Sequence, residues 1–354
     1  MKSADFASLP LAWLSGGSQQ SDIVLSSRIR LARNLSGYPF PARCDDKKRE
    51  EIAGKILERL SETPFVSVLG TWQMDGLDNL RRNVLVERHL ISPDFSQQTG
   101  RGKVVVVDDQ GIVSLMINEE DHLRIQVFLG GLDLFECWRI AGQVDEALES
   151  LNYAYDEEFG YLTACPTNTG TALRASVMVH IPGLEIQRKL GKIIRECNRV
   201  GLTVRGMYGE GSESVGSLFQ ISNQVTLGQR EEELIEKVSG VIASLVQQER
   251  AARLKIWEND TSKLEDKMWR AWGIARYARS IESREAMQML SWIRMGSQMG
   301  ILPQVPPGEW NRLVLDIQQA HLQCFEGRRL AEQEIDVARA SLLRNRLANW
   351  NNDR

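Results

Sequence analysis

The fold of the first part of the chain is decided by the stretch KVVVVDDQGIVSLMIN, residues 103–118. Four consecutive valines at 104–107 are typical of a buried strand, and residues 111–118 predict the next strand. The spacer DDQG at 108–111 is short and polar, as the turn of a hairpin requires. We therefore expect two antiparallel strands here.

Further elements surround this hairpin on both sides. Residues 175–181 alternate towards another strand, which stops at Pro182-Gly183, and helices are expected at 47–60, 142–151 and 184–198. Strands that are joined both by hairpins and by helices are typical of an α+β domain with a largely antiparallel sheet flanked by helices.

The strand signals stop at about residue 230. Residues 231–253 predict a charged amphipathic helix, and apolar residues recur at helical spacing through 264–279 and 313–324 and again in 330–349. We therefore expect an α+β domain at 1–235 and an all-helical domain at 236–354. The tryptophans and methionines of the second domain suit either an internal core or a homodimer interface.

Composition narrows the function classes. Lys plus Arg is 43 and Asp plus Glu is 47, a net charge of −4, so binding of nucleic acid through overall charge is not expected. No apolar run has the length of a membrane helix, and the first residues show no secretory signal, so we expect a cytoplasmic protein. The five cysteines and four histidines are scattered, and we expect no metal site made of protein side chains.

A first polar segment is SSRIRLARN at 26–34. Arg28 and Arg30 alternate along an expected strand, so both guanidinium groups lie on one face. The planar fork of arginine suits a bidentate grip on phosphate oxygens. The alternatives are a solvated basic edge and a contact to nucleic acid.

A second segment is NEEDHLR at 118–124. Three consecutive acids often form no more than a solvated turn. Here they follow an apolar strand directly, and the end of a strand is a fixed position from which a carboxylate can act as a general base.

Two loops complete the set. The stretch CPTNTGTALRAS at 165–176 places the thiol of Cys165 among hydroxyls and leads to Arg174. The stretch RGMYGEGSES at 205–214 is rich in glycine, carries Arg205 and Glu210, and predicts a loop that closes over a ligand.

Taken together, the segments predict an arginine-cradled site for phosphoryl transfer. Five arginines would suit a triphosphate, namely Arg28, Arg30, Arg124, Arg174 and Arg205. Glu120 and Glu210 would hold a cationic acceptor. Neither a Walker A sequence nor the H-R-D and D-F-G motifs of protein kinases are present. Phosphoryl transfer depends on alignment and charge neutralisation more than on covalent help, which fits this set.

These motifs resemble those of the ATP:guanidino phosphotransferases, the family of creatine and arginine kinases. Residues 165–175 match the pattern C-P-[ST]-N-x-G-T-x-x-R-A, and NEEDHLR matches in full. Members that act on small guanidines carry a helical domain before the S-[ST]-R-[VI]-R segment, whereas here 25 residues precede Ser26 and a helical domain follows. That layout, with LVERHLISP at 85–93 and RGxYGE at 205–210, is similar to the bacterial protein-arginine kinases.

The resemblance implies roles for single residues. Glu120 would be the catalytic base, Glu210 a second carboxylate on the acceptor guanidinium, and Cys165 the family's reactive cysteine. Glu119 would serve Mg²⁺-bound waters or loop structure, and Mg²⁺ would bind through ATP rather than through protein ligands. His89 would contact the adenine or ribose. The ATP-binding residues would be Ser26, Ser27, Arg28, Ile29, Arg30, His89, Arg124, Arg174, Ala175, Ser176, Val177, Met178, Arg205, Gly206, Met207, Tyr208, Gly209 and Glu210.

The resemblance also implies a cellular setting and a control site. Protein substrates, a zinc-binding activator protein, a heat-shock repressor and a Clp-type unfoldase would be the partners, in stress response and protein quality control. An R-D-x-x-R-A motif reads phosphoarginine in such kinases; here Asp336 and Arg339 are present but Ile335 replaces the first arginine. We therefore expect weak activation by phosphoarginine or none, and an ordinary amphipathic helix is the alternative. For the whole chain, the alternatives are a small-guanidine kinase and a non-catalytic phosphoarginine-binding adaptor.

Overall fold

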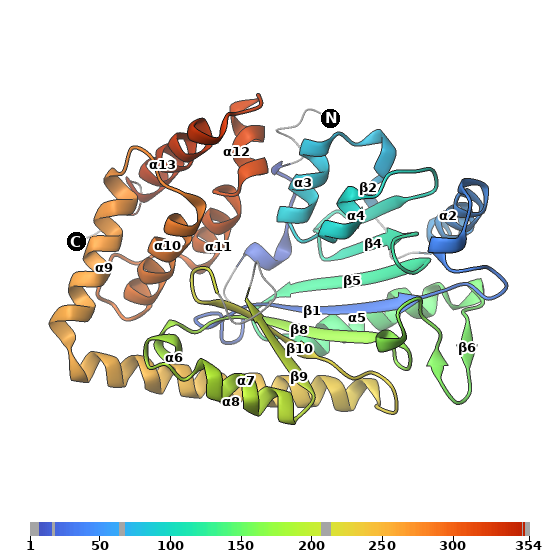
Figure 1. The fold of residues 1–354 in the computed structure, drawn as a ribbon, viewed down its shortest axis with the longest axis horizontal. Helices are drawn as coiled ribbons and strands as arrows, with labels where there is room; N and C mark the ends of the chain where they lie inside the picture. Colours follow the sequence, from blue (N-terminus) through green and yellow to red (C-terminus); the bar gives the residue numbers. More distant parts are fainter. Residues whose placement is uncertain (1–6, 16–17, 64–67, 207–213, 349, 351–354) are drawn as a thin grey trace.

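The computed structural model describes residues 7–15, 18–63, 68–206, 214–348 and 350. Its centre is an eight-stranded antiparallel sheet with the strand order β2-β3-β4-β5-β1-β8-β10-β9 (Figure 1). The strands are β1 (Val24–Arg33), β2 (Val68–Gln73), β3 (Val104–Asp108), β4 (Val113–Ile117), β5 (Leu123–Gly130), β8 (Leu173–His180), β9 (Leu202–Gly206) and β10 (Leu218–Asn223). A separate small hairpin is formed by β6 (Tyr155–Asp156) and β7 (Gly160–Tyr161). The expected hairpin at 103–118 and the α+β class with an antiparallel sheet are confirmed.

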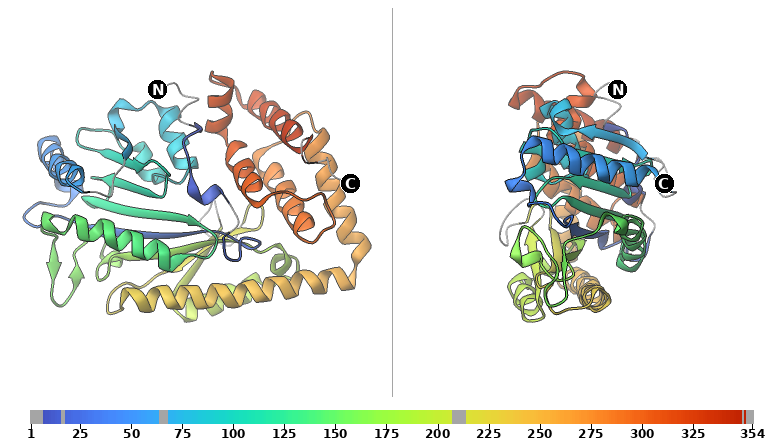
Figure 2. Two further views of the ribbon diagram at one scale, coloured as in Figure 1. Left: turned by 180° about the vertical axis from the view of Figure 1, so that it is seen from behind. Right: turned by 90° about the vertical axis from the view of Figure 1, so that its right-hand side faces the viewer.

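One face of the sheet is covered by helices. They are α2 (Asp46–Ser61), α5 (Leu134–Ala147), α7 (Leu190–Arg199) and the first part of α8 (Glu231–Asn259). Seen from behind, α5 and α8 lie against the sheet (Figure 2). Strand residues such as Ile29, Ala175 and Val177 are fully buried with these helices in one core. Because side chains alternate along a strand, the residues between them face the opposite side, where the site described below is located.

The helices differ from the expected ranges at three places. The helix expected at 142–151 begins earlier, at Leu134. The one expected at 184–198 is two helices, α6 (Pro182–Ile186) and α7, because Arg188 adopts a left-handed backbone conformation with φ of 58°. The segment 313–324 also divides, into α11 (Pro307–Asp316) and α12 (Gln319–Glu326). Periodicity alone does not reveal such short interruptions.

The last part of the chain is helical. It contains α9 (Thr261–Tyr277), α10 (Ser283–Gln298), α11, α12 and α13 (Glu332–Ala348). Trp272, Trp310, Met287 and Met295 are buried in one core of this bundle, as the internal-core alternative expected. The 29-residue helix α8 runs along the sheet and leads into the bundle, so the domain boundary predicted after residue 235 falls within its second turn (Figure 1).

Short elements complete the fold around the uncovered face of the sheet. The helices α3 (Asn79–Glu87) and α4 (Pro93–Gln97) follow β2, and the 3₁₀ turn η1 (Ala12–Leu14) lies against β5 and α11. The uncovered face thus lies between the sheet, the segment 79–97 and the helical bundle. Within the described residues, no helix has both the length and the apolar character that crossing a membrane demands.

Candidate active site

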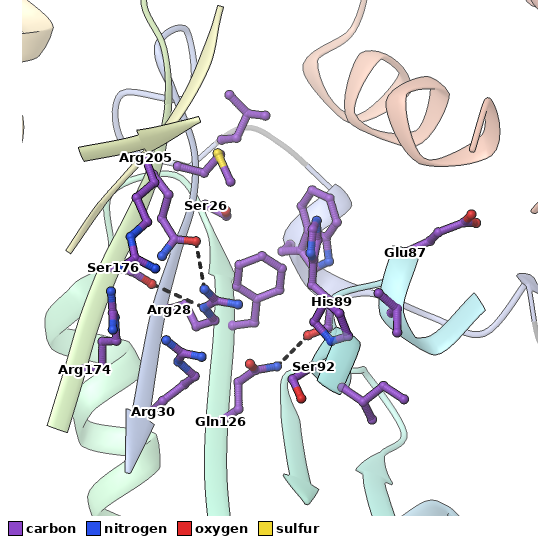
Figure 3. Close-up of a pocket in the computed structure, with 18 of the residues that line it drawn as sticks. Ser26, Arg28, Arg30, Glu87, His89, Ser92, Gln126, Arg174, Ser176 and Arg205 are labelled. Atoms are coloured by element: carbon purple, nitrogen blue, oxygen red, sulfur yellow. Dashed lines mark hydrogen bonds between the residues drawn. The ribbon is translucent and has the colours of Figure 1, made fainter. Parts of the chain in front are cut away.

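Four of the five predicted arginines line one cavity of about 490 Å³ on the uncovered face of the sheet. Arg28 and Arg30 come from β1, Arg174 from β8 and Arg205 from β9 (Figure 3). The strand register sets Arg30 opposite Arg174, and Arg28 opposite Ser176. The alternation predicted for β1 is therefore what brings these guanidinium groups to one face.

Two of these guanidinium groups, those of Arg28 and Arg174, are positioned by neutral side chains. Arg28 donates from Nε to Ser176 Oγ at 3.3 Å and from Nη2 to Gln220 Oε1 at 3.0 Å. Arg174 donates from Nη2 to Ser222 Oγ at 3.0 Å. Among the described residues, the structure shows no ion pair between a carboxylate and any of the four cavity arginines. Within the described part of the chain, their charges therefore have no carboxylate in an ion pair.

Placing several guanidinium groups close together and away from solvent costs free energy. Burial, followed by the charges of the neighbouring Arg174 and Arg124, lowers the pKa of Arg28 to about 10. The pKa of Arg30 is held well below its ordinary value, first by burial and then by Arg28, Arg124 and Arg174. With a pKa of about 10, Arg28 stays cationic at neutral pH. Converging cations that are partly withdrawn from solvent and have no carboxylate in an ion pair among the described residues favour binding of a polyanion such as a triphosphate.

The predicted nucleotide residues divide between the two faces of the sheet. Ser26, Ser176, Met178 and Gly206 line the cavity. Other members of the predicted set have side chains on the opposite face, because strand residues alternate. Ser27 donates there to the carbonyl oxygen of Gly131, and the remaining ones are buried in the helix-covered core, namely Ile29, Ala175 and Val177.

His89 also lines the cavity and holds an unusual backbone conformation, with φ of 60°. Its carbonyl oxygen accepts a hydrogen bond from Gln126 Nε2 at 2.6 Å. Burial, followed by the charge of Arg28, lowers the pKa of the imidazole to about 4. At neutral pH the ring is therefore uncharged, which suits contact with an uncharged part of a ligand.

Arg124, the fifth predicted arginine, lies at the start of β5 and pairs with two carboxylates. Its Nη1 is 2.5 Å from Glu119 Oε2, and its Nη2 donates to Glu120 Oε2 at 3.1 Å. Glu119 is buried and also accepts a hydrogen bond from Ser92 Oγ. It therefore connects the turn between β4 and β5 to the start of α4. Glu120, by contrast, has a side chain that is 44% exposed.

The environment of Glu120 suits a general base. Burial raises the pKa of its carboxyl group; Arg124 opposes this rise, whereas the negative charges of Asp121 and Glu119 add to it. A carboxylate with a raised pKa is a better proton acceptor than an ordinary one. Its contact with Arg124 fixes its direction beside the arginine cluster.

Asp121, to which the sequence interpretation gave no role, connects the segment that carries Glu120 to the segment that carries Cys165. Its Oδ1 accepts hydrogen bonds from Asn34 Nδ2 and from the backbone N–H of Ala164, both at 2.7 Å. Cys165 follows Ala164 directly, and its Sγ lies 3.0 Å from Thr167 Oγ1. Glu120 precedes Asp121 in the chain and Cys165 follows Ala164. The hydrogen bond between Asp121 and Ala164 therefore brings the two predicted segments together. In the sequence, the feature that could have indicated this role is that Asp121 is the third consecutive acid after Asn118.

The predicted residues Met207, Tyr208, Gly209 and Glu210 lie outside the described residues, so the predicted closing loop stays a prediction. Across the part of the chain that the structure describes, no group of three or more His, Cys, Asp or Glu residues is placed to hold a metal ion.

Asp336 and Arg339 line a different cavity, of about 910 Å³, between α3, α10, α12 and α13. Arg339 is buried and donates to the carbonyl oxygens of Ile281 and Ile317 and to Asp336. Ile335 contributes an apolar wall to the same cavity. Arg339 therefore ties α13 to the neighbouring segments of the bundle.

The comparisons with known proteins agree with this geometry. Residues 51–252 match the family described as ATP:guanido phosphotransferase, C-terminal catalytic domain. A solved structure of lombricine kinase has a TM-score of 0.59 and 25% identity to this chain, covering 70% of each chain. A duplicated taurocyamine kinase from Schistosoma mansoni, with bound transition-state analogue components, has a TM-score of 0.60 at 24% identity, covering 75% of this chain and 38% of its own, and shares the fold. The fold and the site define an ATP:guanido phosphotransferase.

Relatives of nearly full length narrow the class. Residues 261–354 match the family described as protein-arginine kinase McsB C-terminal domain. A protein-arginine kinase of Brevibacillus brevis is 45% identical over 95% of this chain and 94% of its own length, and one of Halothermothrix orenii is 46% identical over 95% and 96%. The chain belongs to the protein-arginine kinase branch of the ATP:guanido phosphotransferase family.

Proposed function

We propose that this protein transfers the γ-phosphoryl group of ATP to arginine side chains of proteins. The observation that carries the proposal is the set of four cavity arginines without ion-pair partners among the described residues, next to a carboxylate held by Arg124. A protein that only binds phosphoarginine would need neither a cavity of this volume nor a carboxylate with a raised pKa.

The arginines act by alignment and charge neutralisation. Arg28, Arg30, Arg174 and Arg205 would hold the phosphate oxygens of ATP, and each charge-assisted hydrogen bond strengthens as negative charge develops during transfer. Mg²⁺ would bind the same oxygens together with water, since a triphosphate supplies the oxygen ligands that this ion prefers. The part of the cavity that carries the four arginines fits the phosphates of a metal–nucleotide complex.

Glu120 would orient the acceptor and accept its proton. A guanidinium group is a poor nucleophile because it is protonated and its nitrogen lone pairs are delocalised over the cation. A base that accepts a proton makes one of these nitrogens more nucleophilic. As a nitrogen of the acceptor forms a bond to the γ-phosphorus, the bond between that phosphorus and the bridging oxygen breaks and ADP leaves. The proton lost from nitrogen passes to Glu120. Glu210 would be the second carboxylate on the acceptor, and Cys165 a contact beside it.

The acceptor is inferred from the relatives. Several are named protein-arginine kinases and match nearly the whole chain, including its helical part. The same relationship motivates further proposals: a cytoplasmic homodimer that acts in stress response, with a zinc-binding activator protein, a heat-shock repressor as substrate and a Clp-type unfoldase that degrades the marked proteins.

The test is phosphate transfer from Mg·ATP to casein or to free L-arginine, with neutral pH throughout because the N–P bond is acid-labile. Casein should be phosphorylated on arginine and free L-arginine should react poorly. Transfer to free arginine alone would instead establish a small-guanidine kinase. Tight phosphoarginine binding without any transfer would establish the adaptor.

A further inference from the structure

The cavity that holds the four arginines has a second, different end. Its lining there includes Val86, Ile91, Met116 and Phe128, which are apolar, together with His89. Phe128 is 5.9 Å from the His89 ring, centroid to centroid. The guanidinium carbon of Arg28 lies 6.0 Å from the centroid of Phe128, so Arg28 marks the transition between the two ends. A triphosphate at the arginines leaves the aromatic end for a flat, uncharged group.

Trp13, from the turn η1, closes one side of this aromatic end. Its ring lies 5.1 Å from Phe128 and 5.9 Å from His89, centroid to centroid. Trp13 is 4% exposed, and its indole Nε1–H has no hydrogen-bond partner among the described residues. A buried donor without a partner costs free energy unless a ligand accepts from it.

The other side is closed by the helical bundle. Asn311 and Val314 of α11 and Gln318, two residues after its end, line the same cavity as the arginines. Figure 3 shows a helical segment across the cavity from strand β1, which carries Arg28 and Arg30. The nucleotide cavity is therefore not made by the sheet domain alone.

The amide of Asn311 has a defined direction. Its Oδ1 accepts from Arg294 Nη1 at 3.2 Å, and because arginine can only donate, the oxygen must be the end that faces it. Arg294 is itself buried, donates to the carbonyl oxygen of Ser21 at 2.6 Å and lies over the ring of Trp310. This leaves Asn311 Nδ2 as a second donor, after Trp13 Nε1, on residues that line the cavity.

The bundle is tied to the rim of the cavity. Glu87, at the end of α3, accepts hydrogen bonds from the backbone N–H of Ala320 at 2.8 Å and of His321 at 3.0 Å, and its Oε2 is 2.7 Å from His321 Nδ1. Glu87 lies two residues before His89 and lines the cavity as well. A single carboxylate thus fixes the start of α12, directly after Gln318, to the segment that carries His89.

We propose that the helical bundle forms part of the nucleotide-base subsite, with Asn311 Nδ2 and Trp13 Nε1 donating to acceptor atoms of the adenosine moiety and Val314 packing against the base. This inference rests on the proposed use of ATP. It makes the bundle a direct determinant of nucleotide affinity in addition to any role in assembly.

The test compares two ligands that share phosphates but not a base. Binding of Mg·ADP and of Mg·tripolyphosphate to the full chain is measured by titration calorimetry. Val314→Trp fills the base end, Asn311→Asp keeps the acceptor for Arg294 but replaces the donor by an acceptor, and Gln318→Ala is the mildest change. Glu309→Gln, an exposed position on the same helix, is the matched control. The Tm of each variant reports whether it is folded.

ADP affinity should fall by about tenfold or more in Val314→Trp and by about five- to tenfold in Asn311→Asp, the worth of a hydrogen bond. Tripolyphosphate affinity should stay within about twofold, and Glu309→Gln should match the unmodified protein for both ligands. Unchanged ADP affinity in folded Asn311→Asp and Gln318→Ala, or an equal loss for both ligands, would overturn the proposal. The predicted ADP effects without phosphate transfer to casein would refute the proposed function and leave this inference standing.

Discussion

Two groups of arginines in this protein have the same chemistry and opposite surroundings. Arg28 and Arg30, in the cavity, are held by neutral side chains or by none and have no carboxylate partner among the described residues. Arg253, at the junction of α8 with the sheet, donates to Glu249, to Gln298 and to the carbonyl oxygen of His180. Glu249 accepts in addition from the N–H groups of Gly183 and Leu184.

The difference separates structural charge from functional charge. Arg253 is buried, and each of its three side-chain nitrogens donates a hydrogen bond, so it holds two segments together. The cavity arginines have no carboxylate partner among the described residues, so they are suited to bind an anion. Arg124 lies between the two kinds, because it pairs with a buried carboxylate, Glu119, and with a half-exposed one, Glu120. The three situations predict different responses to substitution.

The largest effect is expected at Glu120. Glu120→Gln keeps the hydrogen bond to Arg124 but removes the proton acceptor, and kcat should fall by about 10²- to 10⁴-fold with little change in ATP affinity. Steady-state kinetics with casein checks this. Glu136→Gln, an exposed acid paired with Arg139, is the control and should be indistinguishable from the unmodified enzyme. A loss of less than about tenfold would refute the role as a base.

Arg253→Met tests the structural group. It leaves Glu249 as a buried carboxylate without its partner, so the free energy of unfolding should decrease by about 3–5 kcal/mol. Urea denaturation measures this change. The KM for ATP of the protein that remains folded should not change. A stable variant with impaired nucleotide binding would mean that the two groups are not distinct.

Arg30→Met tests the cavity group in the opposite sense. Loss of one charge-assisted contact to phosphate should raise the KM for ATP by about 10- to 100-fold. The free energy of unfolding should stay the same or increase, because a buried cation is removed from like-charged neighbours. Parallel measurements of KM and of denaturation check both parts. Destabilisation with unchanged KM would contradict the interpretation.

A smaller effect is expected from pH. The raised pKa of Glu120 places its protonation, and hence the decrease of kcat on acidification, above the ordinary carboxyl value of 4.5. Glu119→Gln removes a negative neighbour, which lowers the pKa of Glu120 and should move this acid limb to lower pH. Initial rates of ADP release, followed as a function of pH, measure the limb. A shift to higher pH would show that Glu119 does not act on Glu120 in this way.

The smallest response is expected at the second cavity. Arg339 is engaged by two carbonyl oxygens and by Asp336, and Ile335 offers no charge to a phosphate group. Added phosphoarginine should therefore change casein phosphorylation by less than about twofold. Strong activation would mean that other groups lining this cavity bind the phosphate.

Sequence patterns predicted the parts of the site that lie on regular strands. The alternation of Arg28 and Arg30 needs only the two-residue period of a strand, and the hairpin at 103–118 is equally local. The break at Arg188 depends on a single left-handed residue that periodicity does not register. Trp13 and Asn311 could not be assigned, because nothing near either of them in the sequence indicates that they meet at the cavity.

The central claim is that this site forms an N–P bond on protein arginine. The direct measurement is ³¹P NMR of casein after incubation with the enzyme and Mg·ATP at neutral pH. The account predicts a phosphoramidate signal that forms at least about 10²-fold more slowly with Glu120→Gln and disappears on mild acid treatment. Phosphate esters alone, or a signal that forms at an undiminished rate with Glu120→Gln, would contradict it.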